Sequence, residues 1–143
     1  MGRGWRSQHE LVLWAAKEVA PFDKHMAGMG NVIDCSRTGN INHTTEKPVE
    51  VIEKLLQVAA FVRVVADPFC GSGTTLLACE RQNRSSLNME LDAAYVDVSV
   101  RRWQDYTKQQ AMLEATGQTF DEVTRERLAP PSRARKNKKT KAA

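Results

Sequence analysis

The spacing of apolar residues changes several times along the 143-residue chain. Residues 9–17 form a short apolar run that fits a buried strand better than a helix, although its length allows either. Residues 18–42 are rich in glycine, asparagine and aspartate, which predicts a long loop with a brief strand near residues 31–35. Apolar residues recur at helical spacing after Pro48, and proline suits the first turn of a helix, so a helix is expected to begin there.

Two further strands and two further helices are expected in the middle of the chain. The β-branched run 61–66 predicts a strand, residues 74–81 a helix, and residues 85–89 a second short strand. Asp92 can cap a longer helix. The apolar positions of that helix are Tyr95, Val96, Val100, Trp103 and Tyr106. This order is that of a parallel βαβ unit, so the expected fold class is α/β.

Composition and cysteine usage exclude several classes of protein. A hydrophobic content of 41% with 27% charged residues is ordinary for a soluble globular protein. No apolar run reaches the roughly 18 residues of a membrane span, and the first ten residues lack a signal peptide's apolar core, so a cytoplasmic location is expected. Cys35, Cys70 and Cys79 lack C-x-x-C spacing, which favours free thiols over a metal site.

The net charge of +4 is concentrated at the C-terminus. Residues 133–141 hold six basic residues and no acid, and without them 15 basic residues face 17 acidic ones, a balance of −2. Such a segment, introduced by "APPS" at 129–132, is expected to be disordered. It could contact nucleic-acid phosphates or simply keep the terminus soluble.

The sequence "VVADPFCGSGTTLLACE", residues 64–80, carries the clearest chemical signal. A glycine-containing loop between a parallel strand and a helix is where α/β folds bind ligands, and Gly71 and Gly73 allow the backbone to approach one closely. Glu90 follows Gly71 by 19 residues, the distance at which an acid at the next strand end accepts hydrogen bonds from ribose hydroxyls. The pattern predicts an adenosine-binding site.

The class of ligand can be narrowed by excluding two other nucleotide-binding motifs. No lysine follows Gly73, as a P-loop requires, and Leu76 stands where a dinucleotide fingerprint has its third glycine. Asp67 opens the loop with an acid, which disfavours a phosphate and favours an ammonium or sulfonium group. S-adenosylmethionine carries both cations and no phosphate. A purely structural strand–turn–helix junction is the alternative.

Four segments together resemble a known family. "DPFCGSGTT" at 67–75 is similar to the cofactor motif of DNA amino-methyltransferases, which methylate the exocyclic amine of adenine (N6) or cytosine (N4). "HTTEKP" at 43–48, "NMELDAAY" at 88–95 and "WRSQHELVLWAAK" at 5–17 resemble segments of the same enzymes, in the permuted order of the β group. The resemblance implies part of a Rossmann-like S-adenosylmethionine-dependent methyltransferase fold, a mostly parallel sheet with flanking helices.

The resemblance assigns cofactor-binding roles residue by residue. Asp67, Phe69, Gly71 and Gly73 would meet the methionine end of S-adenosylmethionine, Glu90 the ribose, and Lys47 the methionine carboxylate. The full expected set is His43, Thr45, Lys47, Asp67, Pro68, Phe69, Gly71, Ser72, Gly73, Thr74, Glu90 and Asp92. For Lys47 a solvated helix-start lysine, and for His43 a merely satisfied polar group, are the alternatives. Asn88 stands where the family commonly has glycine, which would crowd the ribose edge.

The catalytic motif of the family, an Asp, Asn or Ser before Pro-Pro and an aromatic residue, is absent from the chain. In that motif the polar side chain holds the target amine and the aromatic ring stacks on the flipped base. We therefore assign no catalytic residue and no metal, and we expect the C-terminal, cofactor-binding part of a methyltransferase of the restriction–modification type, inactive alone.

The expected partners follow from this incompleteness. A complementing N-terminal half or a second copy would supply the base pocket, and duplex DNA would be contacted through residues 133–141; no membrane partner is expected. We divide the chain into an N-terminal strand and loop segment (1–42), a βαβ core (43–115) and a C-terminal extension (116–143). The alternative function is that of a non-catalytic nucleic-acid-binding accessory protein with a vestigial cofactor loop.

Overall fold

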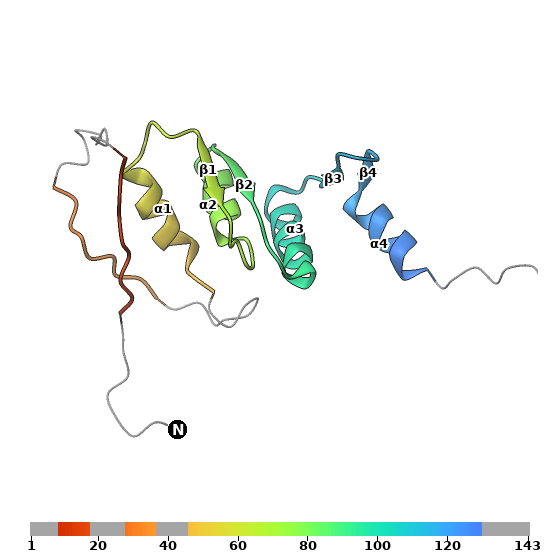
Figure 1. Ribbon diagram of the computed structural model, residues 1–143, viewed down its shortest axis with the longest axis horizontal. Helices are drawn as coiled ribbons and strands as arrows, with labels where there is room; N and C mark the ends of the chain where they lie inside the picture. The colour runs from red at the N-terminus through yellow and green to blue at the C-terminus, as the bar shows by residue number, and fades with distance from the viewer. Residues whose placement is uncertain (1–8, 18–27, 37–45, 130–143) are drawn as a thin grey trace, which may run out of the picture.

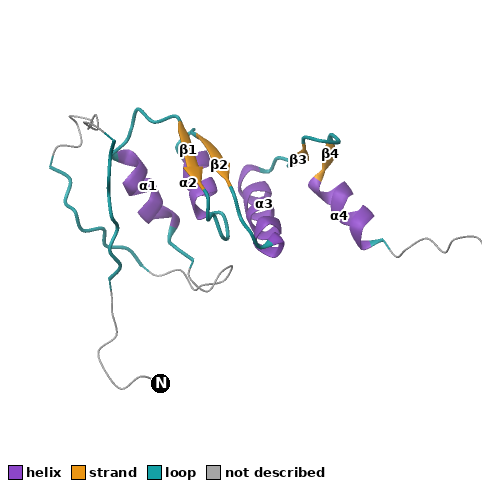
Figure 2. Ribbon diagram, viewed as in Figure 1, coloured by secondary structure: helices purple, strands orange, loops and turns teal. Residues whose placement is uncertain are grey.

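The computed structural model describes residues 9–17, 28–36 and 46–129. Its elements in chain order are α1 (Val49–Gln57), β1 (Val64–Asp67), α2 (Thr74–Arg81), β2 (Ser85–Asn88), α3 (Ala93–Thr107), β3 (Met112–Leu113), β4 (Gln118–Thr119) and α4 (Phe120–Leu128) (Figure 1). Figure 2 shows two separate short sheets, the first flanked by α1, α2 and α3 and the second leading into α4. Within the described ranges, no helix is long and apolar enough to cross a membrane.

The first sheet consists of β1 and β2, which run parallel and are connected through α2. Their register pairs Val64 with Ser85 and Asp67 with Asn88. Because both strands end at the same level, the segments that follow Asp67 and Asn88 leave the sheet side by side. The predicted parallel βαβ unit and the α/β class are confirmed.

A small apolar core lies between α1 and α2. Val49, Leu77 and Ala78 are buried there, and Ile52 and Leu56 pack against them. The helical spacing predicted after Pro48 is what places these α1 side chains on one face. The helix ends at Gln57, earlier than the apolar pattern through Ala59 suggested.

Side chains from the segment between α2 and β2 donate hydrogen bonds to α1 and to the turn that follows it. The Arg84 guanidinium donates hydrogen bonds to the carbonyls of Leu56 and Ala59, at 2.9 and 3.0 Å. The Gln82 amide donates to the carbonyl of Glu53 at 2.8 Å. The Leu56 and Ala59 carbonyls also accept from the Ala59 and Val62 amides, so Arg84 adds a second, charged donor to each of them.

Two predicted boundaries agree closely with the structure and one does not. Helix α2 spans the predicted residues 74–81. Asp92 caps α3 by accepting a hydrogen bond from the Ala94 amide at 2.9 Å. Strand β1 begins at Val64 rather than at Phe61, because residues 58–61 form turns that continue the end of α1.

The strands predicted before α1 do not form. Residues 9–17 are extended but belong to no sheet, and Leu11 and Leu13 are 91% and 94% exposed. Residues 31–35 are likewise without strand pairing. A strand needs a neighbour to satisfy its backbone groups, and the described part of the chain offers none at these positions.

The expected apolar stripe of α3 is only partly buried. Val96 and Tyr106 are 40% and 48% exposed, and the buried residue of this helix is Ser99. A helix buries only the face that meets a packing partner, and α3 packs chiefly against α2 and the loop before it.

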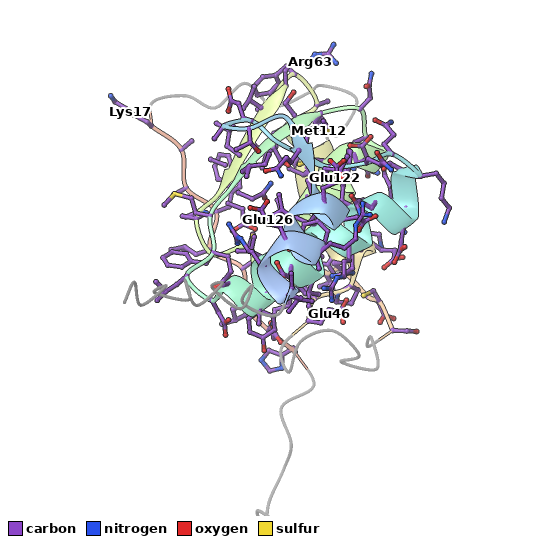
Figure 3. All side chains as sticks on the ribbon, turned by 90° about the vertical axis from the view of Figure 1, so that its right-hand side faces the viewer. Lys17, Glu46, Arg63, Met112, Glu122 and Glu126 are labelled. Carbon is purple, nitrogen blue, oxygen red and sulfur yellow. The ribbon has the colours of Figure 1, made fainter. Side chains whose placement is uncertain are left out.

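Beyond α3 the structure contains a hairpin and a helix to which the sequence analysis assigned no elements. Strands β3 and β4 pair antiparallel, and Gly117 adopts a positive φ of 71° in the turn between them. Helix α4 begins with a capping box in which Thr119 and Glu122 bond reciprocally, and it has no buried residue. Glu122 and Glu126 lie along this helix, which faces the viewer in Figure 3.

Candidate functional site

The glycine loop connects the end of β1 to the start of α2. The Asp67 carboxylate accepts a hydrogen bond from the Phe69 amide at 3.0 Å, and the Gly73 amide donates to the Cys70 carbonyl at 2.8 Å. Gly71 and Gly73 have positive φ values of 51° and 80°. Residues with a Cβ rarely adopt this backbone region, so the two glycines allow the sharp turn.

Glu90 joins this loop to the end of β2. One oxygen of its carboxylate accepts a hydrogen bond from the Gly71 amide at 2.7 Å and the other from the Asp92 amide at 3.0 Å. The Cys70 amide donates to the Met89 carbonyl at 3.0 Å. A carboxylate can accept about four hydrogen bonds, so Glu90 can still accept from the hydroxyls of a ligand.

Helix α3 packs closely against the glycine loop through Ser99. A Cβ added to Gly73 would lie 2.9 Å from both Cβ and Oγ of Ser99. Ser99 Oγ donates a hydrogen bond to the Gly71 carbonyl at 2.8 Å. Gly73 therefore serves two purposes: its backbone conformation and the close packing of α3.

Arg102, one turn after Ser99, binds two segments at once. Its Nη1 donates to the carbonyl and the hydroxyl of Ser72, at 2.6 and 2.9 Å. Its Nη2 lies 2.9 Å from a carboxylate oxygen of Glu46, and the two side chains are only 17% and 4% exposed. Glu46, labelled in Figure 3, belongs to the segment that precedes α1.

The electrostatic environment of the loop is acidic. Burial raises the pKa of the Cys70 thiol, and the carboxylates of Asp67 and Glu90 raise it further, against a lowering hydrogen bond with Ser99. The thiol is therefore protonated at neutral pH and is a poor nucleophile. Two carboxylates beside a loop of backbone amides suit a ligand with cationic groups better than a phosphate.

Most of the predicted cofactor residues lie together in the structure. The segment from Asp67 to Thr74, including Pro68, lies beside Glu90 and Asp92. Within this segment the Phe69 side chain is 87% exposed. Lys47 is tied to this group by its backbone, because its carbonyl accepts a hydrogen bond from Thr74 Oγ1 at 3.3 Å.

The Lys47 side chain, by contrast, contacts the N-terminal segment. Its Nζ lies 3.0 and 3.2 Å from the two carboxylate oxygens of Glu10. The predictions for His43 and Thr45 concern residues that lie outside the described ranges.

Three residues that shape this site were missed in the sequence. The sequence patterns assigned no role to Glu46, which lies inside "HTTEKP", or to Ser99 and Arg102, which lie on α3 outside its expected apolar stripe. A signal was present, because Tyr95, Ser99, Arg102 and Tyr106 recur at helical spacing. Polar residues at the centre of such a row indicate a helix face that packs against polar backbone.

Asn88 is placed at the end of β2, where crowding of the ribose edge was expected. Its Nδ2 donates a hydrogen bond to Ser86 Oγ at 2.8 Å. Its Oδ1 is buried and has no hydrogen-bond partner among the described residues. A buried, unsatisfied oxygen is energetically unfavourable.

A parallel βαβ unit with a glycine loop and an acid at the second strand end is a cofactor-binding arrangement of the α/β class. The family whose sequence model matches this chain is described as DNA methylase, and the match covers residues 13–101. That is more than half of the chain, and the chain belongs to this family.

Several named relatives are similar to parts of the chain. The type II methyltransferase M.HindIII of Haemophilus influenzae is 36% identical over 100 residues, which are 66% of this chain and 32% of that protein. M.ScaI of Streptomyces caespitosus is 38% identical over 61 residues, 42% of this chain and 20% of the relative. The DNA adenine methyltransferase YhdJ of Escherichia coli is 28% identical over 102 residues, 67% of this chain and 34% of the relative.

The chain thus spans about a fifth to a third of the length of these relatives. Among solved structures, the M1.HpyAVI–SAM complex is 26% identical, with 50% of this chain and 36% of that chain covered and a TM-score of 0.43. A putative DNA modification methylase from Thermus thermophilus is 34% identical, with 50% and 28% covered and a TM-score of 0.40.

Proposed function

We propose that this chain binds S-adenosylmethionine and forms the cofactor-binding part of a DNA amino-methyltransferase acting on adenine N6 or cytosine N4. The observation that carries the proposal is the hydrogen bond between the Gly71 amide and the Glu90 carboxylate. It brings the glycine loop and the second strand end together in a chain of the DNA methylase family. The family relatives named above are themselves methyltransferases.

The residues fit the charge of the cofactor. Bound S-adenosylmethionine supplies an activated methyl group on a sulfonium. Asp67 and Glu90 provide negative charge beside the loop, as the raised pKa of Cys70 reflects after the larger effect of burial. Glu90 would accept hydrogen bonds from the ribose hydroxyls while its bonds to Gly71 and Asp92 hold the carboxylate in place.

Lys47 would bind the methionine carboxylate of the cofactor only by exchanging partners. In the structure its ammonium group is paired with Glu10 on the surface. Exposed ion pairs contribute little, about 0–1 kcal/mol, so exchange of one carboxylate for another costs little. His43 and Thr45 belong to the same proposed set on sequence grounds alone.

Methyl transfer also requires a pocket for the target base, and we propose that another polypeptide segment supplies it. The chain has no Asp-Pro-Pro-aromatic sequence to hold the amine. One face of the βαβ sheet is apolar and open: Val64 and Leu87 on the strands are 54% and 65% exposed, and Met89 beyond β2 is 69% exposed. An apolar sheet face of this kind calls for a covering partner, and a complementing methyltransferase half or a second copy would provide it.

DNA is the partner on which such a complete enzyme acts. We propose that residues 133–141, which lie outside the described ranges, contribute contacts to DNA phosphates through their six basic side chains. Removing them should abolish most of the salt-sensitive DNA binding of the chain and leave cofactor binding unchanged.

The decisive experiment is calorimetric titration with S-adenosylhomocysteine, the demethylated and chemically stable product. Wild type should bind, and Glu90→Gln should bind roughly 10- to 100-fold more weakly, since hydrogen bonds to a charged group are worth about 1.5–3 kcal/mol. Glu114→Gln removes an acid near the β3–β4 turn, away from the loop, and is the matched control. A folded wild-type chain that binds no S-adenosylhomocysteine disproves the proposal.

A methyl-transfer assay completes the test. The isolated chain should not transfer labelled methyl groups from S-adenosylmethionine to DNA, because it has no base-holding motif. Transfer above the level of the Glu90→Gln variant would show that the chain is a complete enzyme.

A further inference from the structure

The glycine loop is held by side chains from outside the βαβ connection. Three hydrogen bonds from α3 reach it: Ser99 Oγ to the Gly71 carbonyl, and Arg102 Nη1 to the carbonyl and hydroxyl of Ser72. Each of these links joins residues 28 or 30 positions apart. The shape of the loop therefore depends on helix α3 as well as on its own glycines.

Holding these carbonyls also orients the amides. A peptide group is planar, so a carbonyl that points toward α3 turns the N–H of the next residue the opposite way. Ser99 fixes the peptide between Gly71 and Ser72, and Arg102 fixes the peptide between Ser72 and Gly73. The Gly73 N–H is thereby turned onto the Cys70 carbonyl within the loop, and the Ser72 N–H is turned away from α3. Helix α3 thus sets the direction of the Ser72 amide.

Arg102 extends this control to a second segment. Its other terminal nitrogen pairs with Glu46 at 2.9 Å, and Glu46 is almost fully buried at 4% exposure. The adjacent Lys47 carbonyl receives a hydrogen bond from Thr74 Oγ1, at the other end of the glycine loop. The segment before α1 and the glycine loop are therefore connected at two points.

We propose that Arg102 is a positioning residue for the cofactor site: its guanidinium locks the glycine loop and the Glu46–Lys47 segment into one arrangement. The inference rests on the proposed cofactor function and concerns how the site is held, since Arg102 itself need not touch the ligand. The planar fork of arginine suits this role, because it donates in two directions at fixed geometry, which a lysine ammonium does not reproduce.

Neighbouring Arg101 provides a matched control. It lies on the same helix but is exposed, with its guanidinium 5.6 Å from the centre of the Phe120 ring. Arg101→Lys and Arg102→Lys are the same chemical change one residue apart. We expect Arg101→Lys to leave S-adenosylhomocysteine affinity unchanged and Arg102→Lys to weaken it severalfold.

A double variant separates positioning from stability. Arg102→Met alone takes the guanidinium away from the nearly buried Glu46 carboxylate, which destabilises the fold. Adding Glu46→Gln removes the buried negative charge that Arg102 balanced, so the melting temperature should recover toward wild type. If Arg102 positions the loop, the double variant still binds S-adenosylhomocysteine about tenfold more weakly than wild type, the loss expected when a hydrogen-bonding group is misplaced.

Hydrogen exchange in the ligand-free chain gives a second measurement that does not depend on cofactor binding. Amides of residues 70–74 should exchange faster in Arg102→Lys and in the double variant, and at the wild-type rate in Arg101→Lys. Recovery of both affinity and exchange in the double variant would overturn the inference, because Arg102 would then matter only through stability. If wild type binds no S-adenosylhomocysteine, the proposed function fails, and the exchange comparison alone decides whether Arg102 holds the loop.

Discussion

The βαβ region, residues 46–107, and the C-terminal hairpin and helix, residues 111–129, are held together in opposite ways. In the first, side chains reach far along the sequence: Arg84 binds a carbonyl 25 residues away and Arg102 one 30 residues away. In the second, the bonds are local, as from Arg125 to the Asp121 carbonyl four residues earlier. The first region should therefore lose far more stability per substitution, because each change there disturbs several elements at once.

Two glycines with similar positive φ values test this difference most strongly. Gly73 and Gly117 have φ values of 80° and 71°, but only at Gly73 would a Cβ meet another element. Gly117→Ala should cost about 1–2 kcal/mol, the strain of alanine in the left-handed region. Gly73→Ala should cost about 2–5 kcal/mol in free energy of unfolding, because overpacking against Ser99 adds to that strain. Urea denaturation measures both.

A double-mutant cycle identifies the source of the extra cost. Ser99→Gly removes the atoms that an alanine Cβ at position 73 would approach to 2.9 Å. The cost of Gly73→Ala should then fall by about 1–2 kcal/mol in the Ser99→Gly background, a coupling typical of residues in contact. Equal costs for Gly73→Ala and Gly117→Ala would show that the packing of α3 on the loop does not matter.

Two arginines test the same comparison at smaller magnitude. Arg84→Met should destabilise the chain by about 2–3 kcal/mol, because the Leu56 and Ala59 carbonyls lose a charged donor. Arg125→Met removes one exposed bond of 3.3 Å within α4 and should change the free energy of unfolding by less than about 0.5 kcal/mol. The melting temperatures of the two variants measure this difference. Similar shifts in melting temperature would contradict the contrast between long-range and local bonding.

What the sequence could predict follows the same division. The βαβ order, the bounds of α2 and the Asp92 cap follow from local patterns: β-branched runs, glycine turns and a capping side chain. Helical spacing could place Arg102 on a packing face of α3, but its partners could not be predicted, because they depend on three segments meeting in space. The predicted strand at 9–17 failed for the related reason that an apolar run forms a strand only where a neighbour exists.

The C-terminal region shows the reverse error. Its local signals were present and were overlooked: Thr119 and Glu122 have the spacing of a capping box, and Gly117 lies two residues before the cap. Helix α4 is thus an element that short-range rules predict. Contacts between residues far apart in the sequence leave no local signal, whereas the sequence around α4 does carry one.

The smallest expected effect is a difference in pH response between the two regions. Burial raises the pKa of both Cys70 and Cys79 above the usual value of 9.0, and both thiols lie in the βαβ region. Because the pKa is raised in the folded state, these thiols ionise more readily in the unfolded chain. The free energy of unfolding therefore keeps its full value below about pH 9 and falls as the pH rises through the folded-state pKa. The C-terminal region contains no cysteine.

In α4 the sign is opposite. Hydrogen bonds from the Thr119 backbone and side chain lower the pKa of Glu122 below its usual value of 4.5. The capping contribution is therefore present above about pH 4.5 and is lost as the pH falls through the lower, folded-state pKa. Amide exchange should show α4 opening first on acidification and the βαβ region weakening on alkalisation, with Glu122→Gln abolishing the first response and Cys70→Ala reducing the second. Loss of protection in both regions at the same pH would show that they unfold as one unit, and that the contrast in their bonding has no consequence for their stability.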